Sequence, residues 1–199
     1  MRKRRVGLLG GSFNPAHEGH VHISRLALKH LALDELWWLV SPQNPLKPVK
    51  GMASLAKRLA AAQALAPDRR VRVTDLERRL GTRFTVDTLK ALQRRFPRIA
   101  FVWIAGADIL EQLPRWRRWP EVMSRVPIAV FDRPSYSLKA LASKAAQRYR
   151  RQRIAPRTAH RLADMTPPAW VFVPSRLHAA SATALRKQGR VTPKRSRKS

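Results

Sequence analysis

The apolar residues among the first 31 positions follow two different spacings, which predict a strand and then a helix, joined by a glycine-rich turn. Residues 6–10 form a short apolar run bounded by glycine, typical of a strand buried on both faces. The apolar residues that follow recur at helical spacing: Ile23, Leu26, Ala27 and Leu31. The Gly-Gly-Ser-Phe-Asn-Pro sequence between them contains residue types that favour a tight turn.

This alternation continues to residue 173. Further apolar runs predict strands at residues 35–40, 71–74, 99–105, 127–131 and 170–173. Helical patterns cover residues 54–66 and 86–96, and residues 138–163 indicate one or two basic surface helices. Alternating strands and helices favour an α/β fold with a doubly wound, mostly parallel sheet. Ligands bind such sheets outside the carboxyl ends of the strands, so the segments after strands are the candidates for chemistry.

The length of 199 residues suits one domain, which we expect over residues 1–188. Residues 189–199 contain no large apolar residue except Val191, and we expect a basic, disordered tail. The first 13 residues imitate a signal peptide, but three glycines interrupt the apolar run, so we expect a cytoplasmic protein. No apolar stretch approaches the ~20 residues of a membrane helix, and no membrane partner is expected.

The chain carries 41 Lys and Arg against 12 Asp and Glu, a net charge of +29. Removing the basic stretches 2–5 and 187–199 leaves +19, so the domain itself is basic and favours polyanionic partners. A nucleic-acid-binding module is one reading, but aromatic residues are only 7% and no zinc-finger spacing or aromatic RNA-binding motif occurs, so no specific nucleic acid is expected. The absence of cysteine excludes disulfides, thiolate metal sites and a cysteine nucleophile.

The segment after the first predicted strand has the strongest chemical character. Gly10 and Gly11 allow a phosphate to approach backbone N–H groups, because no Cβ stands in the way. His17 and His20 share a face at the start of the next helix, near the positive end of its dipole. The alternative is an ordinary glycine turn followed by two exposed histidines. The full string from residue 10 to 20 is much rarer than its parts and favours an anion site.

The string GGSFNPAHEGH matches neither the dinucleotide fingerprint nor a Walker-type loop. It resembles the (His/Thr)-x-Gly-His signature of the nucleotidyltransferases and, within them, the opening motif of the bacterial nicotinate-mononucleotide adenylyltransferases. The resemblance implies a Rossmann-like nucleotidyltransferase fold. It assigns catalytic roles near the α- and β-phosphates to His17 and His20. It implies ATP contacts for the turn: Gly10, Gly11, Ser12 and Phe13.

The sequence ASATALR at residues 180–186 is similar to the Ile-Ser-Ser-Thr-x-Ile-Arg motif of the same superfamily. Ser181 is a candidate helix N-cap, and Arg186 can pair with a phosphate in a fork geometry. The resemblance places Ser181 and Thr183 at ATP and makes Arg186 catalytic at the triphosphate. Ala182 replaces the second Ser of the motif, which removes one hydroxyl. By itself, the segment reads as the start of an ordinary amphipathic helix.

Three internal segments concern the acceptor and the ATP ribose. RFTVDTL at 83–89 resembles the Tyr-Thr-x-Asp-Thr-Leu element, which places Thr85 by the nicotinate nucleotide. Gly106 and Asp108 resemble the Gly-x-Asp element near the ATP ribose. Trp116 begins a Trp-x-x-Trp that lies against the nicotinate ring in the family. The alternatives are that Thr85 and Asp108 only cap helices and that the tryptophans only pack.

Two weaker signals follow the second and fifth strands. The proline-rich loop after residue 41 resembles a shortened acceptor-binding loop, which makes Asn44 and Lys47 candidates for binding the nicotinate nucleotide. Arg133 is placed to reach a phosphate. In so basic a chain, the alternative is that Lys47 and Arg133 are simply solvated cations.

The resemblance implies adenylyl transfer from ATP to nicotinate mononucleotide, giving deamido-NAD and pyrophosphate in NAD biosynthesis. The nucleophile is already an anion, so catalysis needs alignment and charge stabilisation. Mg²⁺ is expected to arrive with ATP, because no carboxylate cluster is apparent to hold it and no metal-ligand residue is predicted. The open alternative is an adenylyltransferase with another phosphate acceptor, such as phosphopantetheine. No signal specifies an oligomeric state.

Overall fold

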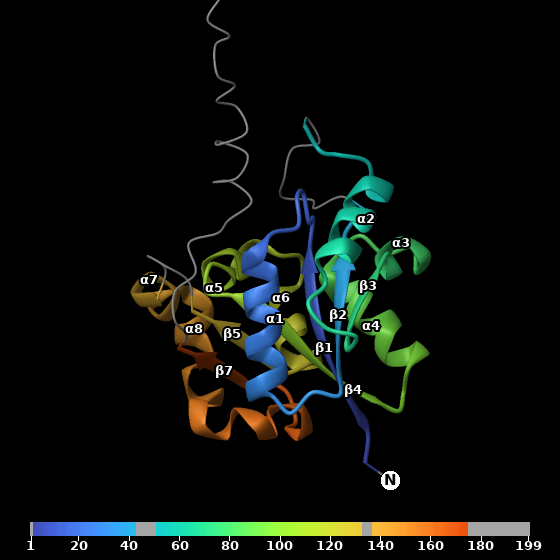
Figure 1. Ribbon diagram of the computed structural model, residues 1–199. Coiled ribbons are helices and arrows are strands. Elements are labelled where there is room, and N and C mark those ends of the chain that lie inside the picture. The colour runs from blue at the N-terminus through green and yellow to red at the C-terminus, as the bar shows by residue number, and fades with distance from the viewer. Residues whose placement is uncertain (1, 43–50, 133–136, 175–199) are drawn as a thin grey trace, which may run out of the picture.

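A seven-stranded sheet forms the centre of the protein in a computed structural model, which describes residues 2–42, 51–132 and 137–174 (Figure 1). Its strands are β1 (Arg4–Gly11), β2 (Glu35–Val40), β3 (Val71–Thr74), β4 (Ile99–Gly106), β5 (Ile128–Phe131), β6 (Arg153–Ile154) and β7 (Trp170–Val173). They lie in the order β3-β2-β1-β4-β5-β7-β6, and every pair is parallel. The doubly wound fold expected from the sequence is therefore confirmed.

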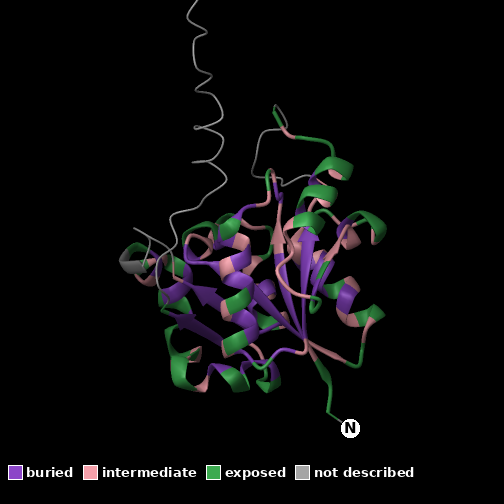
Figure 2. Ribbon diagram, viewed as in Figure 1, coloured by how far each residue is buried: buried purple, intermediate pink, exposed green. Residues whose placement is uncertain are grey.

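Helices cover both faces of this sheet. The α-helices are α1 (Glu18–His30), α2 (Leu55–Leu65), α3 (Leu76–Arg79), α4 (Thr85–Arg95), α5 (Ile109–Gln112), α6 (Trp119–Arg125), α7 (Ser137–Ala142) and α8 (Lys144–Arg148). The 3₁₀ helices are η1 (Leu113–Arg115), η2 (Arg150–Gln152) and η3 (Pro156–Asp164). Residues of α1, α2 and η3 pack into one core cluster, and residues of α4, α6 and α8 into the other. The central strands are consequently buried on both sides, while the outward helical faces are exposed (Figure 2).

The chain reverses its direction of travel across the sheet between β1 and β4. It leaves β1 for β2 and β3 and then returns to β4 on the other side of β1. The carboxyl ends of these two strands mark the topological switch point, where open α/β sheets bind ligands. The loops after β1 and β2 lie side by side there, because Gly11 is paired with Val40.

Several boundaries differ from the sequence prediction. Strand β1 begins at Arg4, because pairing with β4 extends over the two arginines at its start. Residues 138–163 form two α-helices, as expected, but also the 3₁₀ helix η2, strand β6 and most of the 3₁₀ helix η3. Strand β6 was not predicted, because a two-residue edge strand has no apolar periodicity.

The described helices include none with both the length and the apolar character needed to cross a membrane. The N-terminal segment that imitates a signal peptide instead forms β1, the third strand of the sheet.

Candidate active site

His17 and His20 cap helix α1 through their own ring nitrogens. His17 is the N-cap residue, and its Nδ1 accepts a hydrogen bond of 3.1 Å from the backbone N–H of Gly19. The Nδ1 of His20 accepts one of 3.2 Å from the backbone N–H of His17. Because both Nδ1 atoms are acceptors, the hydrogen-bond network assigns the proton of each neutral ring to Nε2. The local sequence thus fixes both the position and the tautomer of the two imidazoles.

Aromatic side chains pack against the His20 ring. The ring of Phe13 lies 4.5 Å from that of His20 and is stacked at 5.1 Å on Trp38 of β2, measured between centroids. The two histidine rings are 3.9 Å apart. Phe13 is only 1% exposed and adopts a φ of 46°, a conformation that is costly for an aromatic residue. The buried ring of Phe13 therefore positions His20. The ATP contact that the sequence predicts for Phe13 is then left to its backbone.

Arg58 of α2 joins the loops that follow β1 and β2. Its guanidinium donates to the carbonyl oxygens of Ser12 and Ser41 at 2.7 Å, and to those of Pro42 and Ala53 at 2.9 Å. Arg58 is 3% exposed, and burial lowers its pKa. The partners of the guanidinium within the described ranges are thus backbone carbonyl oxygens of the two loops and of the residue before α2's cap.

On the other side of the β1 end, a cavity of about 120 Å³ opens between β1, β4 and α4. An apolar cavity of ~150 Å³ accepts benzene, so this space is on the scale of one aromatic ring. We call it the β1/β4 cavity. Its apolar and glycine lining is Gly10, Gly11, Phe84, Trp103 and Trp116, and its polar lining is Ser41, Glu77, Thr85, Arg83, Arg115 and Arg117.

The two tryptophans of the Trp-x-x-Trp element have different surroundings. Trp116 lines the β1/β4 cavity and meets Trp103 edge to face, with 6.1 Å between ring centroids. Trp119 instead contacts the ring of Tyr149 at 5.8 Å and lies under the guanidinium of Arg148. Trp119 therefore packs within the protein, whereas Trp116 lines the cavity, and contact of Trp116 with the nicotinate ring stays a prediction.

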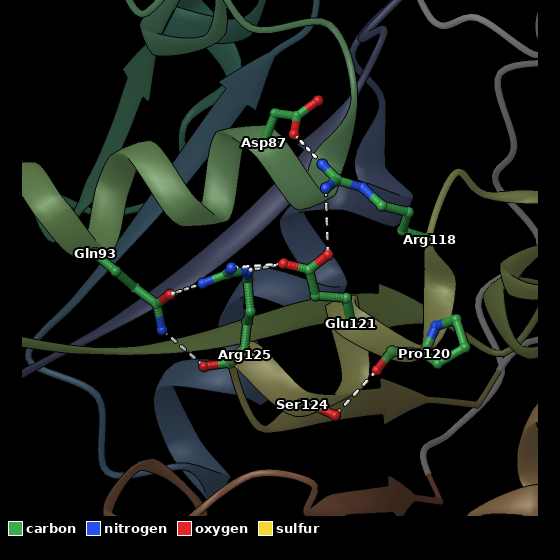
Figure 3. Close-up of polar contacts among 7 residues, drawn as sticks. All are labelled: Asp87, Gln93, Arg118, Pro120, Glu121, Ser124 and Arg125. Carbon is green, nitrogen blue, oxygen red and sulfur yellow. Dashed lines mark hydrogen bonds and ion pairs between the residues drawn. The ribbon is translucent and has the colours of Figure 1, made fainter.

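A polar network fixes the Trp116 segment against α4 (Figure 3). Arg118 is the N-cap of α6, with a φ of 49°, and forms ion pairs with Asp87 in the first turn of α4 and with Glu121. Arg125 pairs with Glu121 and donates to Gln93 of α4 at 3.2 Å. These contacts join α6, which follows Trp116, to α4, which carries Thr85.

Glu77 of α3 places a buried carboxyl group at the β1/β4 cavity. It is 7% exposed and hydrogen bonded to the side chains of Ser41 and Thr88. Burial raises the pKa of Glu77 to about 7, and these two hydrogen bonds lower it only in part. The group therefore changes charge in the neutral pH range.

The raised pKa of Glu77 predicts a pH dependence of stability. The folded state holds this proton more tightly than the unfolded state, so the stabilisation is complete below pH 4.5 and is lost as the pH rises to about 7. We expect a loss of roughly 3 kcal/mol in the free energy of unfolding across this window. Urea denaturation at pH 5 and pH 8 should show this loss in wild type and not in Glu77→Gln. The matched control is Glu111→Gln, at an exposed carboxyl, which should keep the wild-type dependence.

Gly10 gives a second prediction, because a Cβ at this position would lie 2.6 Å from Cη2 of Trp103. Trp103 is buried, so Gly10→Ala should push the indole into the β1/β4 cavity and raise the KM of the acceptor about tenfold, the effect of ~1.4 kcal/mol. In Gly11→Ala the nearest atom, Cε2 of Phe13, is 3.4 Å away, and the acceptor KM should change less. Steady-state kinetics with the acceptor varied compares the two. Equal KM values would contradict the role given to the indole.

The structure separates the predicted site residues into two groups on either side of the β1 end. His17, His20, Ser12 and Phe13 lie towards α1, whereas Thr85 and Trp116 line the β1/β4 cavity, with Gly10 and Gly11 between. Phe84 occupies the N-cap position of α4 and Thr85 the first helical position, so Thr85 is not the cap residue.

Gly106 and Asp108 lie at the end of β4, on the same edge of the sheet. Gly106 is the last residue of the strand, and Asp108 is at the N-cap position of α5, without a side-chain cap bond. Its carboxylate accepts a hydrogen bond of 3.2 Å from Gln112. Six other predicted residues lie outside the described ranges, as does the tail: Asn44, Lys47, Arg133, Ser181, Thr183 and Arg186.

Sequence reasoning missed Glu77, Arg58 and the arginines of the cavity. Arg58 had a usable signal, since it lies three residues after Leu55 and four before Ala62, on the apolar face of its helix. Glu77 had no comparable sequence signal, because α3 is a single turn in which no apolar periodicity can be recognised. The cavity arginines are indistinguishable by sequence from the other basic residues.

No group of three or more His, Asp or Glu side chains suited to a metal ion occurs in the portion of the chain that the structure describes. The donor set at the β1 end consists of backbone N–H groups, imidazoles and arginines, which suits phosphate better than a bare cation. That Mg²⁺ arrives with ATP stays a prediction.

Comparison with known proteins identifies the class. The model of the cytidylyltransferase-like family matches residues 8–188, so the chain is a nucleotidyltransferase of this class. Its relatives include proteins named "Probable nicotinate-nucleotide adenylyltransferase": one of Parvibaculum lavamentivorans, 54% identical over 93% of this chain and 92% of the relative, and one of Methylorubrum extorquens, 52% identical over 92% and 98%. The chain belongs to the nicotinate-nucleotide adenylyltransferases, an enzyme family of NAD biosynthesis, which confirms the resemblance seen in its motifs.

The solved structures agree at the level of the fold. A Plasmodium falciparum nicotinic acid mononucleotide adenylyltransferase complexed with NaAD superimposes with a TM-score of 0.69 over 92% of this chain and 83% of that one. The same enzyme complexed with APC gives 0.68. Both are 14% identical to this chain, so they establish the shared architecture and not the roles of single residues.

Proposed function

We propose that this protein transfers the adenylyl group of ATP to nicotinate mononucleotide, releasing pyrophosphate and deamido-NAD. The observation that carries the proposal is the pair of sites that meet at Gly10 and Gly11. One side has two imidazoles at a helix N-terminus, suited to phosphates, and the other has a ring-sized cavity walled by Trp116 and Trp103. A mononucleotide that places its ring in the cavity brings its phosphate to the β1 end.

The reaction forms one P–O bond and breaks another. An oxygen of the mononucleotide phosphate attacks the α-phosphorus of ATP, and the bond from that phosphorus to the bridging oxygen of the β-phosphate breaks. No protein nucleophile is needed, because the attacking oxygen already carries negative charge. The task of the protein is to align the two phosphates and to stabilise the charge on the non-bridging oxygens.

We assign this stabilisation to the Nε2–H groups of His17 and His20, with Arg186, Ser181 and Thr183 at the triphosphate. The backbone of the turn, Gly10 to Phe13, contacts ATP, and Gly106 and Asp108 face its ribose. The tautomer of the histidines supports the first assignment, because an Nε2–H group can donate a hydrogen bond to a phosphate oxygen even when the ring is neutral.

Acceptor binding involves Thr85 and Trp116, with Asn44, Lys47 and Arg133 from the loops. The first turn of α4 supports Thr85, since its N-terminal backbone N–H groups favour a carboxylate. Three arginines that line the cavity add positive charge for the carboxylate of the nicotinate ring: Arg83, Arg115 and Arg117. Mg²⁺, when bound with ATP, supplies charge neutralisation to the phosphates. The cytoplasmic location expected from the sequence is part of this proposal.

The test is release of pyrophosphate from ATP with a panel of phosphate acceptors: nicotinate mononucleotide, nicotinamide mononucleotide and phosphopantetheine. We expect turnover with nicotinate mononucleotide, with the product identified as deamido-NAD by mass. Turnover with phosphopantetheine alone would favour the alternative acceptor. Activity with neither pyridine mononucleotide would overturn the proposal.

A further inference from the structure

Glu77 stands out because the β1/β4 cavity, under the proposed function, receives a ring that carries a carboxylate. A second carboxyl group in that cavity repels such a ligand when it is ionised and not when it is protonated. Glu77 is buried and lines the cavity together with Thr85 and Trp116. It plays no part in the phosphoryl transfer described above, so its position needs a separate explanation.

The partners of Glu77 are hydroxyl groups. The side chains of Ser41 and Thr88 are hydrogen bonded to its carboxyl, and Oγ1 of Thr88 is 2.9 Å from Oγ1 of Thr82. Hydroxyls can donate to a carboxylate or accept from a carboxylic acid, so this cluster accommodates both protonation states. Over the residues that the structure describes, no cation lies within ion-pair distance of Glu77 to hold it ionised.

Charged groups surround Glu77 on the elements packed against it. Arg83, Arg115 and Arg117 line the cavity. Arg58 donates a hydrogen bond to the carbonyl oxygen of Ser41. Asp75 is paired with Arg78 of α3, and Asp87 of α4 is paired with Arg118. Both carboxylates in this set are already paired. Three arginines and one titratable acid therefore line the cavity.

We propose that Glu77 is a specificity-determining residue whose neutral carboxyl admits a carboxylate-bearing pyridine ring and whose ionised form disfavours it relative to a carboxamide. This inference rests on the proposed function. Since burial raises the pKa of Glu77 to about 7, the change from one form to the other falls in the neutral pH range. Preference for nicotinate over nicotinamide mononucleotide should consequently fall as the pH rises.

The experiment measures kcat/KM for both mononucleotides between pH 6 and pH 9 and reports their ratio. Effects of pH on the shared phosphate, on ATP and on the histidines act on both acceptors and cancel in this ratio. If the acid binds only the protonated enzyme, the ratio falls by up to tenfold per pH unit above about 7. Glu77→Gln keeps the size and both hydrogen-bonding functions but cannot ionise, so its ratio should be independent of pH.

Glu111→Gln, at an exposed carboxyl, is the matched control and should retain the wild-type pH dependence. A wild-type ratio that does not change with pH, or an equal change in Glu77→Gln, would overturn the inference. Circular dichroism and thermal unfolding of each variant confirm that folded proteins are compared. If nicotinate mononucleotide is not turned over at any pH, the proposed function itself fails, which is a different result from a flat ratio.

Discussion

Replacing His20 by Asn is expected to lower kcat by about 100- to 1,000-fold while leaving the protein folded, the effect typical of losing one donor to a developing oxyanion. The Oδ1 of Asn can accept from the backbone N–H of His17 in place of Nδ1, so the cap of α1 is kept. The shorter side chain has no donor at the position of Nε2. Steady-state kinetics and thermal unfolding on the same preparation separate the two effects.

His20→Gln is the complementary variant, because its Nε2 can approach the position of the lost donor while the cap bond is broken. We expect it to recover part of kcat and to lose stability, the reverse of the pattern for Asn. His160→Asn, at an exposed histidine of η3, should change neither quantity. A wild-type kcat in His20→Asn would remove His20 from the catalytic group.

The second large effect is expected at Arg58, where replacement by Met should cost roughly 3 kcal/mol or more in the free energy of unfolding. Four backbone carbonyls lose their donor at once, and each buried unsatisfied acceptor costs about 1–3 kcal/mol before any relaxation. Because Ser12 and Pro42 belong to different loops, we also expect the KM of both substrates to rise. Urea denaturation and initial rates with each substrate varied provide the measurements.

Lys57→Met is the matched control, since Lys57 precedes Arg58 on α2 and is exposed. It removes the same charge and should leave stability and both KM values near wild type. Arg58→Lys should restore only part of the loss, because one ammonium group cannot reproduce the planar fork that reaches both loops. Equal stabilities of Arg58→Met and Lys57→Met would show that the four hydrogen bonds contribute little.

The charge of the chain acquires a partial explanation from the structure. Of the many cations, Arg58 organises the loops and three arginines line the β1/β4 cavity. Several others pair with the few acids, as Arg4 and Arg72 do with the buried Glu35.

The sequence by itself determined the six longer strands, the parallel sheet and the family. These depend on local signals: apolar period, glycine at the turn, and a histidine motif within one segment. The role of His17 and His20 as each other's capping partners is also local, because it joins residues three apart. It went unrecognised only because imidazole is an uncommon cap.

Only the tertiary structure decided which residues share the β1/β4 cavity. Trp103, Glu77, Thr85 and Trp116 come from four separate segments of the chain, and whether they meet depends on the spatial order of the strands in the sheet. The different surroundings of Trp116 and Trp119 and the raised pKa of Glu77 likewise depend on the tertiary structure. The burial and the electrostatic surroundings of a side chain depend on neighbours that are distant in sequence, so no local sequence pattern reveals them.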